Sequence, residues 1–516
     1  MIKSTKFYTK VFVKTPIFIL SLLFNMYIFI FQLKALDSSI LEYTSLISYA
    51  MIASNLFFLV ATSSIISKKL EIMEFLEKDK FKKYLIIILS GLIISIIMSI
   101  IPIIMILVFK NNNINFYFVV KGVLNFFIIW NLSNMISISL AASVAILLNR
   151  WNSLFISLFI YSIFPFYAIN PLFKSQLINK FLNIYSDSTA IKTNILCDEI
   201  FNMSYICDKV FILCLILLML ILVKILLNKK ILDSIAFIIV IFFIYITTLI
   251  GSNSVTYVHK YNDSNLSNVN YNINSYDMNI NIDNKLKNIA SICLDINGDT
   301  DSITFLLDDL FKVEGIKIDN APVNFIHSND KIVLDYKTNE KKSINVIILY
   351  EGSVHVEDEL GIDTFYCNKH VVNLTDSLYW YPCLYNNSLI NYNIDIITSA
   401  NIYSNLNVER QSNNLLSNKY KVKGTSSRVE LFAGQYKEVV DNGIEYIIPS
   451  TYNLEDFKIK LNKKISYYLN KHEEELSKYD FELLKEKKYK KVIIGMSINT
   501  NSYIKISNDV LLINYI

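Results

Sequence analysis

The sequence predicts a polytopic α-helical membrane protein of about seven spans, followed by an extracellular, mainly-β domain of the saddle or β-sandwich kind and a short α/β tail. Three observations predict this fold class. Apolar residues make up 53% of the 516 residues and charged residues only 18%, which is typical of a membrane protein. Long apolar runs occur only before Gly251, in a basic half of the chain. The remaining half is acidic on balance and carries short alternating runs that favour strands.

The apolar half contains seven stretches that could cross a membrane. A spanning helix needs about 20 predominantly apolar residues to cover about 30 Å of hydrocarbon. The first stretch lacks a small-residue cleavage site, so we interpret it as an anchor and not as a signal peptide. The predicted spans are residues 15–33, 45–66, 84–109, 118–147, 152–169, 210–227 and 231–250.

The distribution of basic residues predicts the orientation of these spans. Short cytoplasmic loops carry an excess of Lys and Arg. Most of the basic residues lie before span 1 and in the loops after spans 2, 4 and 6, for example at Lys10, Lys69, Arg150 and Lys229. We therefore expect a multi-pass protein of the plasma membrane with a cytoplasmic amino terminus. An odd number of spans then makes residues 252–516 extracellular.

Two features of the spans bear on function. Ionisable residues are nearly absent at mid-depth, which argues against a proton- or ion-coupled transporter. The fourth span also carries small residues at a spacing of four, which places them on one helix face where another helix can approach closely. This face can serve ordinary bundle packing, or it can form a subunit interface or a substrate path. Its members are Ser133, Ser137, Ala141 and Ala145.

The loop between spans 2 and 3, residues 68–84, predicts an amphipathic helix in the cytoplasm. Apolar residues recur at spacing three, and acidic residues occupy the opposite surface. Such a helix can lie on anionic lipid, or it can dock on a cytoplasmic partner. In the second case the contact residues are Glu71, Glu74, Phe75, Leu76 and Glu77.

A basic amino-terminal segment, six spans and a charged helix after span 2 resemble the permease subunit of a type-2 ABC exporter, over roughly residues 1–230. The resemblance implies that the 68–84 helix couples to an ATPase, and that the permease works as a homo- or heterodimer. The phosphate-binding motif GxxxxGK[ST] is absent from the sequence, so the ATPase would be a separate chain. A seventh span would carry the second half of the chain across the bilayer.

After a linker at 252–275, residues 276–452 read as a β-rich domain and residues 453–516 as an α/β tail. The strand-rich opening, LYEG at 349–352, WYP at 380–382 and FAGQY at 432–436 resemble the amino-terminal domain of aminopeptidase N-type zinc peptidases. The helical segment and KKYKKVIIGM that follow resemble the entry to that family's catalytic domain. The resemblance implies a peptidase-like domain that lies outside the membrane.

The residues that a zinc peptidase needs are missing from this sequence. His472-Glu473-Glu474-Glu475-Leu476 has Leu where HExxH requires its second His, and no two His residues stand four apart. We therefore predict no catalytic residue, no metal site and no cofactor. The sequence also shows no basic patch interleaved with aromatic residues, so no nucleic-acid partner is expected. Cys197 and Cys207 share one predicted outer loop and could form a disulfide there.

The leading hypothesis is thus a non-catalytic membrane subunit of an ABC-type exporter, which works with a separate ATPase and the lipid bilayer and carries an extracellular domain. One alternative is a membrane-anchored peptidase that is inactive alone or completed by another chain. Another is an extracellular peptide-binding or immunity protein. The substrate and the direction of transport do not follow from the sequence.

Overall fold

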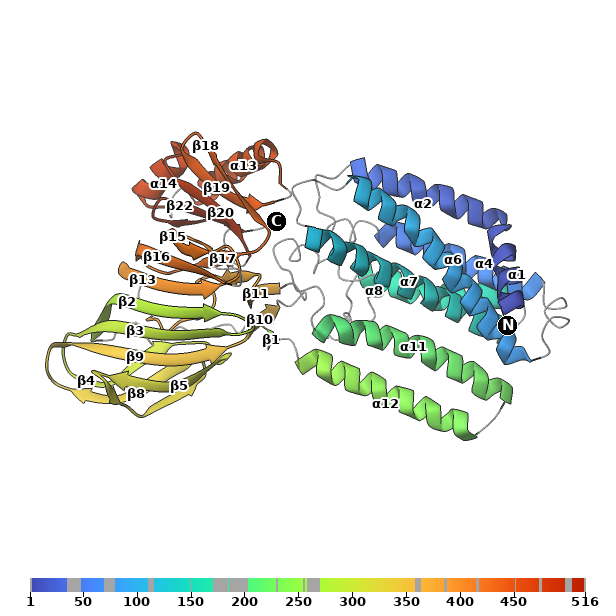
Figure 1. Ribbon diagram of the computed structural model, residues 1–516, viewed down its shortest axis with the longest axis horizontal. Coiled ribbons are helices and arrows are strands. Elements are labelled where there is room, and N and C mark those ends of the chain that lie inside the picture. The colour runs from blue at the N-terminus through green and yellow to red at the C-terminus, as the bar shows by residue number, and fades with distance from the viewer. Residues whose placement is uncertain are drawn as a thin grey trace. The chain divides into compact units, whose positions relative to one another are not determined.

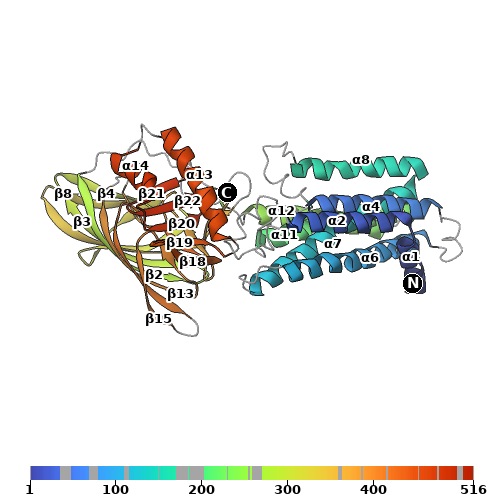
Figure 2. The ribbon, with the colours of Figure 1, turned by 90° about the horizontal axis from the view of Figure 1, so that it is seen from above.

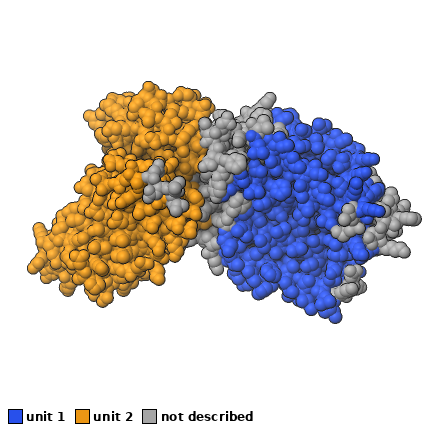
Figure 3. Space-filling view, in the orientation of Figure 1, with its two compact units in different colours: residues 1–195, 199–255, 359–361 blue, residues 196–198, 256–358, 362–516 orange. Residues whose placement is uncertain are grey.

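The chain forms two compact units, which Figure 3 shows in different colours. The helical unit comprises residues 1–195 and 199–255 with 359–361, and the β-rich unit comprises residues 256–358 and 362–516 with 196–198. The computed structural model describes residues 2–34, 48–68, 79–109, 116–148, 150–169, 184, 203–228, 231–253, 256–257, 270–357, 363–384, 388–413, 417–450, 452–472, 476–496 and 504–514.

Each of the seven apolar stretches coincides with a helix of the helical unit over nearly all of its described residues (Figures 1 and 2). Helix α7 packs on α4, α6, α8 and α11, whereas α12 packs chiefly on α11. The helices are α1 (Ile2–Val13), α2 (Pro16–Lys34), α4 (Ser48–Lys68), α6 (Lys80–Phe109), α7 (Phe116–Leu147), α8 (Arg150–Ile169), α11 (Met203–Asn228) and α12 (Ile231–Asn253).

Among the described residues, four helices are long and apolar enough to cross a membrane: α6, α7, α11 and α12. Helices α1 and α2 form a pair bent by 66°, which adds a fifth candidate if the pair is one span. The apolar parts of α4 and α8, Ala50–Ile66 and Asn152–Phe166, are shorter. Length and composition therefore support four or five spans, and the number seven stays a prediction.

Local sequence signals set two of the helix starts. Pro16 is the first residue of α2, where its fixed φ suits a helix start and its missing N–H costs nothing. Asp79 precedes α6 and accepts a hydrogen bond from the backbone N–H of Phe81 at 2.9 Å. This cap satisfies one of the N–H groups that a helix start leaves without a partner.

The β-rich unit is built around an eight-stranded sheet. Along β2 and β3 buried and exposed positions alternate, so one face of the sheet packs on the core and the other faces away from it. In order across the sheet, the strands are β15 (Asn407–Asn413), β16 (Asn418–Ser426), β13 (Ile390–Thr398), β2 (Tyr271–Ile282), β3 (Leu286–Ile296), β9 (Lys342–Gly352), β5 (Phe311–Ile318) and β6 (Ala321–Pro322).

Two smaller sheets complete the β-rich core. One has three strands, β4 (Thr300–Leu306), β8 (Lys331–Thr338) and β7 (Phe325–Ser328). The other has six short strands, β1 (Thr256–Tyr257), β10 (Val354–Glu357), β11 (Asp363–Cys367), β12 (Val372–Leu374), β17 (Leu431–Ala433) and β14 (Tyr403–Ser404). This part of the chain is mainly β and contains several sheets, in agreement with the sequence prediction. Strand β2 begins at Tyr271, inside the segment that the sequence analysis assigned to the linker.

The WYP segment lies in the middle of this core. Trp380 and Tyr381 are buried, with their rings in edge-to-face contact at 4.6 Å. The hydroxyl of Tyr276 on β2 donates a hydrogen bond to the carbonyl of Pro382 at 2.6 Å, and the hydroxyl of Tyr350 on β9 donates to the carbonyl of Trp380 at 3.1 Å. The aromatic segment thus joins the large sheet to the rest of the core.

The tail is a five-stranded sheet with two helices, α13 (Leu454–His472) and α14 (Lys478–Lys485). Asn373 on β12 ties this tail to the β-rich core: its Nδ2 donates to the carbonyl of Met496 at 2.9 Å, and its Oδ1 accepts from the Met496 N–H at 3.1 Å. The strands are, in order, β18 (Tyr436–Asp441), β19 (Ile444–Pro449), β20 (Lys491–Gly495), β22 (Val510–Asn514) and β21 (Ile504–Ser507).

Candidate functional site

The predicted ATPase-coupling residues lie outside the described part of the chain. Glu71, Glu74, Phe75, Leu76 and Glu77 fall between the end of α4 at Lys68 and the cap of α6 at Asp79. Residues 80–84 of the predicted amphipathic helix belong to α6. The coupling role therefore stays a prediction.

The predicted packing face of the fourth span lies on α7. Ser133, Ser137, Ala141 and Ala145 are all buried within the helical unit. The Ser133 hydroxyl donates to the carbonyl of Trp130 at 3.1 Å, and that of Ser137 donates to the Ser133 carbonyl at 3.4 Å. Because both hydroxyls bond to their own helix, this face presents little polarity to neighbouring helices. A role in a subunit interface or a substrate path stays a prediction.

A chain of hydrogen-bonded polar side chains, which we call the polar seam, crosses the core of the helical unit. It consists of Ser54 on α4, Ser95 on α6, and Asn131 and Asn134 on α7. Ser54 donates to Asn134 Oδ1 at 3.0 Å, Asn134 Nδ2 donates to Ser95 Oγ at 2.9 Å, and Ser95 Oγ donates to Asn131 Oδ1 at 2.8 Å. The seam therefore fixes three helices to one another through side-chain hydrogen bonds.

The sequence analysis did not identify the polar seam. Its signal was the pair Asn131 and Asn134, whose spacing of three places both amides on one face of a predominantly apolar helix. Asn55 lies next to the seam residue Ser54 and is 0% exposed. Neither amide atom of Asn55 has a hydrogen-bond partner among the described residues. An amide buried in this way costs free energy, because it loses its hydrogen bonds to water without replacement.

The predicted disulfide is not tested by the structure. Cys207 is buried in α11, and Cys197 lies outside the described residues. The bond between them stays a prediction.

Of the HEEEL segment the structure describes His472 and Leu476, and the Leu476 N–H donates to the His472 carbonyl at 3.1 Å. His472 is the last described residue of helix α13, and its ring lies 4.9 Å from that of Tyr468. Leu476 packs against the hydrophobic core of the tail, where an HExxH helix would carry its second His. Within the described part of the chain, no group of three or more His, Cys, Asp or Glu side chains is placed to hold a metal ion.

Glu430 is a fully buried carboxyl group of the β-rich unit, 0% exposed. Lys505 on β21 contacts its carboxylate and also lies 2.6 Å from the carboxylate of Asp376. Burial raises the pKa of Glu430 to about 7, against the opposing effect of the Lys505 charge. Burial acts to lower the pKa of Lys505, but the two carboxylates raise it above its usual value. Glu430 can thus change its protonation state near neutral pH, at the junction of the core and the tail.

Comparisons with known proteins found little. The sequence matches no known protein family and no curated protein. Among solved structures, a variant of an M1 zinc metallopeptidase from Deinococcus radiodurans aligns with a TM-score of 0.35 and 9% identity, over 48% of this chain and 62% of that one. Native yeast LTA4 hydrolase aligns with a TM-score of 0.34 and 9% identity, over 51% of this chain and 44% of that one. The chain thus spans less than two thirds of either protein, and scores of this size establish neither fold nor activity.

Proposed function

We propose that the chain is a membrane subunit of an ABC-type exporter, driven by a separate ATPase that docks on residues 68–84. The observation that carries this proposal is a bundle with apolar side chains on its exposed surface and a hydrogen-bonded polar seam in its core. We further propose that the amino terminus is cytoplasmic and that residues 252–516 lie on the extracellular side of the plasma membrane.

The exposed surface of α12 supports a location in lipid. Its side chains are apolar and widely exposed, including Ile231 at 82%, Ile238 at 65% and Phe242 at 60%. Exposed apolar area on this scale is unfavourable in water and favourable in hydrocarbon. The only acid of α12, Asp233, is paired with Lys224 of α11 at 2.6 Å, which neutralises its charge near the helix end.

The polar seam supports a bundle that is assembled inside the membrane. Polar side chains in membrane helices face the bundle interior, where hydrogen bonds between helices replace those to water. Ser95 and Asn134 follow this rule, because each bonds across a helix boundary. A rigid connection of α4, α6 and α7 suits a transport domain, since a movement imposed on the α4–α6 loop would be passed to α7.

Co-purification tests the partner. The tagged full chain, extracted in a mild detergent, should retain a protein that co-elutes with it and hydrolyses ATP. A triple variant with Glu71→Ala, Phe75→Ala and Leu76→Ala should lose this protein, whereas the control Lys229→Ala/Lys230→Ala should keep it. Retention of the ATPase by the triple variant contradicts the coupling role, and its absence from the unaltered chain contradicts the exporter proposal.

The orientation has its own test. In a cysteine-free variant, a single cysteine is introduced at Asp301 or at Lys229. A membrane-impermeant maleimide applied to intact cells should label the first position, and should reach the second only after lysis. Labelling of Lys229→Cys in intact cells would reverse the proposed orientation.

We also propose that the β-rich unit does not act alone as a peptidase. The packing of Leu476 supports this, since the zinc-peptidase arrangement needs a second His one helical turn after the first, at the position that Leu476 occupies. Metal analysis of the purified chain, together with hydrolysis of an aminoacyl reporter, tests the proposal. Stoichiometric zinc accompanied by hydrolysis would show that it is wrong.

A further inference from the structure

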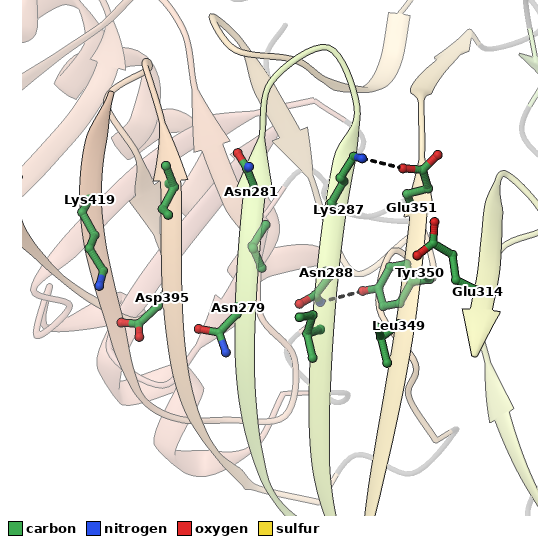
Figure 4. Close-up of a pocket in the computed structure, with 13 residues that line it drawn as sticks. Asn279, Asn281, Lys287, Asn288, Glu314, Leu349, Tyr350, Glu351, Asp395 and Lys419 are labelled. Carbon is green, nitrogen blue, oxygen red and sulfur yellow. Dashed lines mark hydrogen bonds and ion pairs between the residues drawn. The ribbon is translucent and has the colours of Figure 1, made fainter. Parts of the chain in front are cut away.

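The outer face of the eight-stranded sheet carries a hollow of about 380 Å³ (Figure 4). Side chains from six adjacent strands line it, from Lys419 on β16 at one side to Glu314 on β5 at the other. Figure 4 shows Asn279 and Asn281 of β2 between these two charges. The hollow belongs to the β-rich unit and is far in sequence from the polar seam.

The strand register places an aliphatic surface beside the amides. Asn279 pairs with Ile289 on β3, and Ile289 pairs with Leu349 on β9. Ile289 is 47% exposed, and Ile397 on the other side of β2 is 43% exposed. A Cβ atom added to Gly315, the register partner of Leu349, would meet nothing within 4 Å, so space continues beyond Leu349.

Two acceptor atoms on this face lack a donor. Asp395 is the register partner of Asn279, and Asn393 lies two positions along β13, so both side chains project from the same face. Asp395 Oδ1 and Asn393 Oδ1 are buried and have no hydrogen-bond partner among the described residues. A bound molecule that brings N–H donors would offset the cost of leaving these acceptors unpaired.

The charges of the hollow differ between its two sides. In the middle, Glu351 is already paired with Lys287 at 3.0 Å and with Lys285 at 3.1 Å. The charge at the β5 side is the carboxylate of Glu314. The β16 side carries the ammonium of Lys419, with the carboxylate of Asp395 on the neighbouring strand β13. A ligand that carries a cation at one end and an anion at the other therefore complements the hollow.

We propose that this hollow binds an extended peptide segment that crosses the strands, with a basic side chain at Glu314, an acidic side chain at Lys419 and an aliphatic side chain on Ile289. Lys419 and Glu314 are five inter-strand spacings apart, which is about 24 Å at about 4.8 Å each. An extended chain advances about 3.4 Å per residue, so about seven residues cover this distance. The backbone N–H groups supply donors for Asp395 and for the amides of Asn279 and Asn281.

Fluorescence polarisation with the detergent-solubilised full chain tests the site. The probe is a labelled heptapeptide, blocked at both ends, with one Glu and one Lys at its ends and Ala and Leu between them. Two further probes carry Glu at both ends or Lys at both ends. We expect the mixed probe to bind most tightly. Ile289→Trp, which fills the hollow, should weaken the binding of this probe by about tenfold or more.

Reversing the charge at Glu314 tests whether the ends of the peptide are selected by charge. Glu314→Lys should weaken the mixed probe about fivefold and strengthen the probe with two Glu residues by a similar factor. Glu314 is exposed, so this change should leave the fold intact. The control Asp301→Lys alters an exposed charge on β4 and should leave all three probes unchanged.

Three results would overturn the proposal. Equal affinities for the three probes would show that Glu314 and Lys419 do not discriminate between acidic and basic peptide ends. A loss of binding in Asp301→Lys equal to that in Glu314→Lys would show a non-specific charge effect. Concentration-dependent dimerisation abolished by Ile289→Trp, without peptide binding, would assign the face to a second copy of this chain.

Discussion

Replacing Glu430 with glutamine removes one titrating carboxyl from the junction between the β-rich core and the tail. The pKa of Glu430 is about 7 in the folded protein, and its ordinary value is 4.5. Between these two pH values the folded state holds a proton that the unfolded state has released. The contribution of this proton to the free energy of unfolding is fully present below pH 4.5 and is lost as the pH rises towards 7.

The size of this effect follows from the width of the window. Each pH unit changes the free energy of unfolding by about 1.4 kcal/mol for one proton, so the whole window amounts to about 3 kcal/mol. Glutamine resembles the protonated side chain in shape and charge and does not titrate. Glu430→Gln should therefore flatten the decline between pH 5 and pH 7, and should make the unit more stable than the unaltered protein above pH 7.

Trp380 is buried in the β-rich core and provides a local probe. In a background with Trp130→Phe and Trp151→Phe it is the only tryptophan left, so its fluorescence reports unfolding of this unit alone. Urea titrations from pH 5 to pH 8 then give the free energy of unfolding for both proteins. Glu455→Gln, at a side chain 77% exposed, serves as the control and should leave the pH profile unchanged. Parallel profiles for Glu430→Gln and the unaltered protein would refute the reasoning.

Three further substitutions test the packing. Asn373→Ala removes both hydrogen bonds to the Met496 backbone and leaves buried polar groups unpaired, which should cost about 2–4 kcal/mol in the same urea titration. Asn134→Leu removes two interhelical hydrogen bonds of the polar seam and should lower the stability of the helical unit in detergent by about 1–3 kcal/mol, measured by thermal unfolding. Gly352→Ala places a Cβ 2.7 Å from the carbonyl oxygen of Leu310, so the backbone must shift, at a cost of about 1–3 kcal/mol in urea.

The sequence predicted the positions of the helices because a long apolar run has few alternatives to a helix. It did not predict where α11 begins. The apolar run starts at residue 210, whereas the helix starts at Met203. The hydroxyl of Tyr205, within this polar first part, donates to Asn125 Oδ1 on α7 at 2.8 Å. A contact between helices thus extends α11 beyond its apolar residues, and the linear pattern contains no sign of that contact.

The sequence predicted that this half of the chain forms strands more accurately than it predicted where each strand begins and ends. The segment 302–319 reads as one strand, but the structure divides it between β4 and β5. The break lies at two aspartates that bond to backbone groups. Asp308 Oδ1 accepts from the Leu310 N–H at 2.9 Å, and Asp309 Oδ1 accepts from the Asp330 N–H at 3.1 Å. Asp309 thus takes part in a turn whose partner is distant in sequence, so neighbouring residues could not predict it.

The candidate sites depend even more strongly on distant pairs. Asn131 and Asn134 are visible in the sequence as polar residues in an apolar run, but their partners lie on α4 and α6. On the large sheet, alternation shows which residues of β2 and β13 project from one face. Only the parallel pairing of these two strands, more than 100 residues apart, brings Asp395 beside Asn279. Periodicity therefore predicts the direction of a side chain, whereas long-range pairing decides its neighbours.

The two units serve one function only if peptide binding and ATP hydrolysis are thermodynamically coupled. A peptide on the outer sheet can change the activity of a cytoplasmic ATPase only by binding two states of the complex with different affinity. Coupling is reciprocal for binding, so a non-hydrolysable ATP analogue must then change the affinity of the hollow for the mixed heptapeptide. If the nucleotide no longer changed the peptide affinity in Asn134→Leu, and the affinity without nucleotide were preserved, the polar seam would be shown to transmit the coupling. An affinity that is unaffected by nucleotide would instead make the β-rich unit a binding module that is only anchored by the helices.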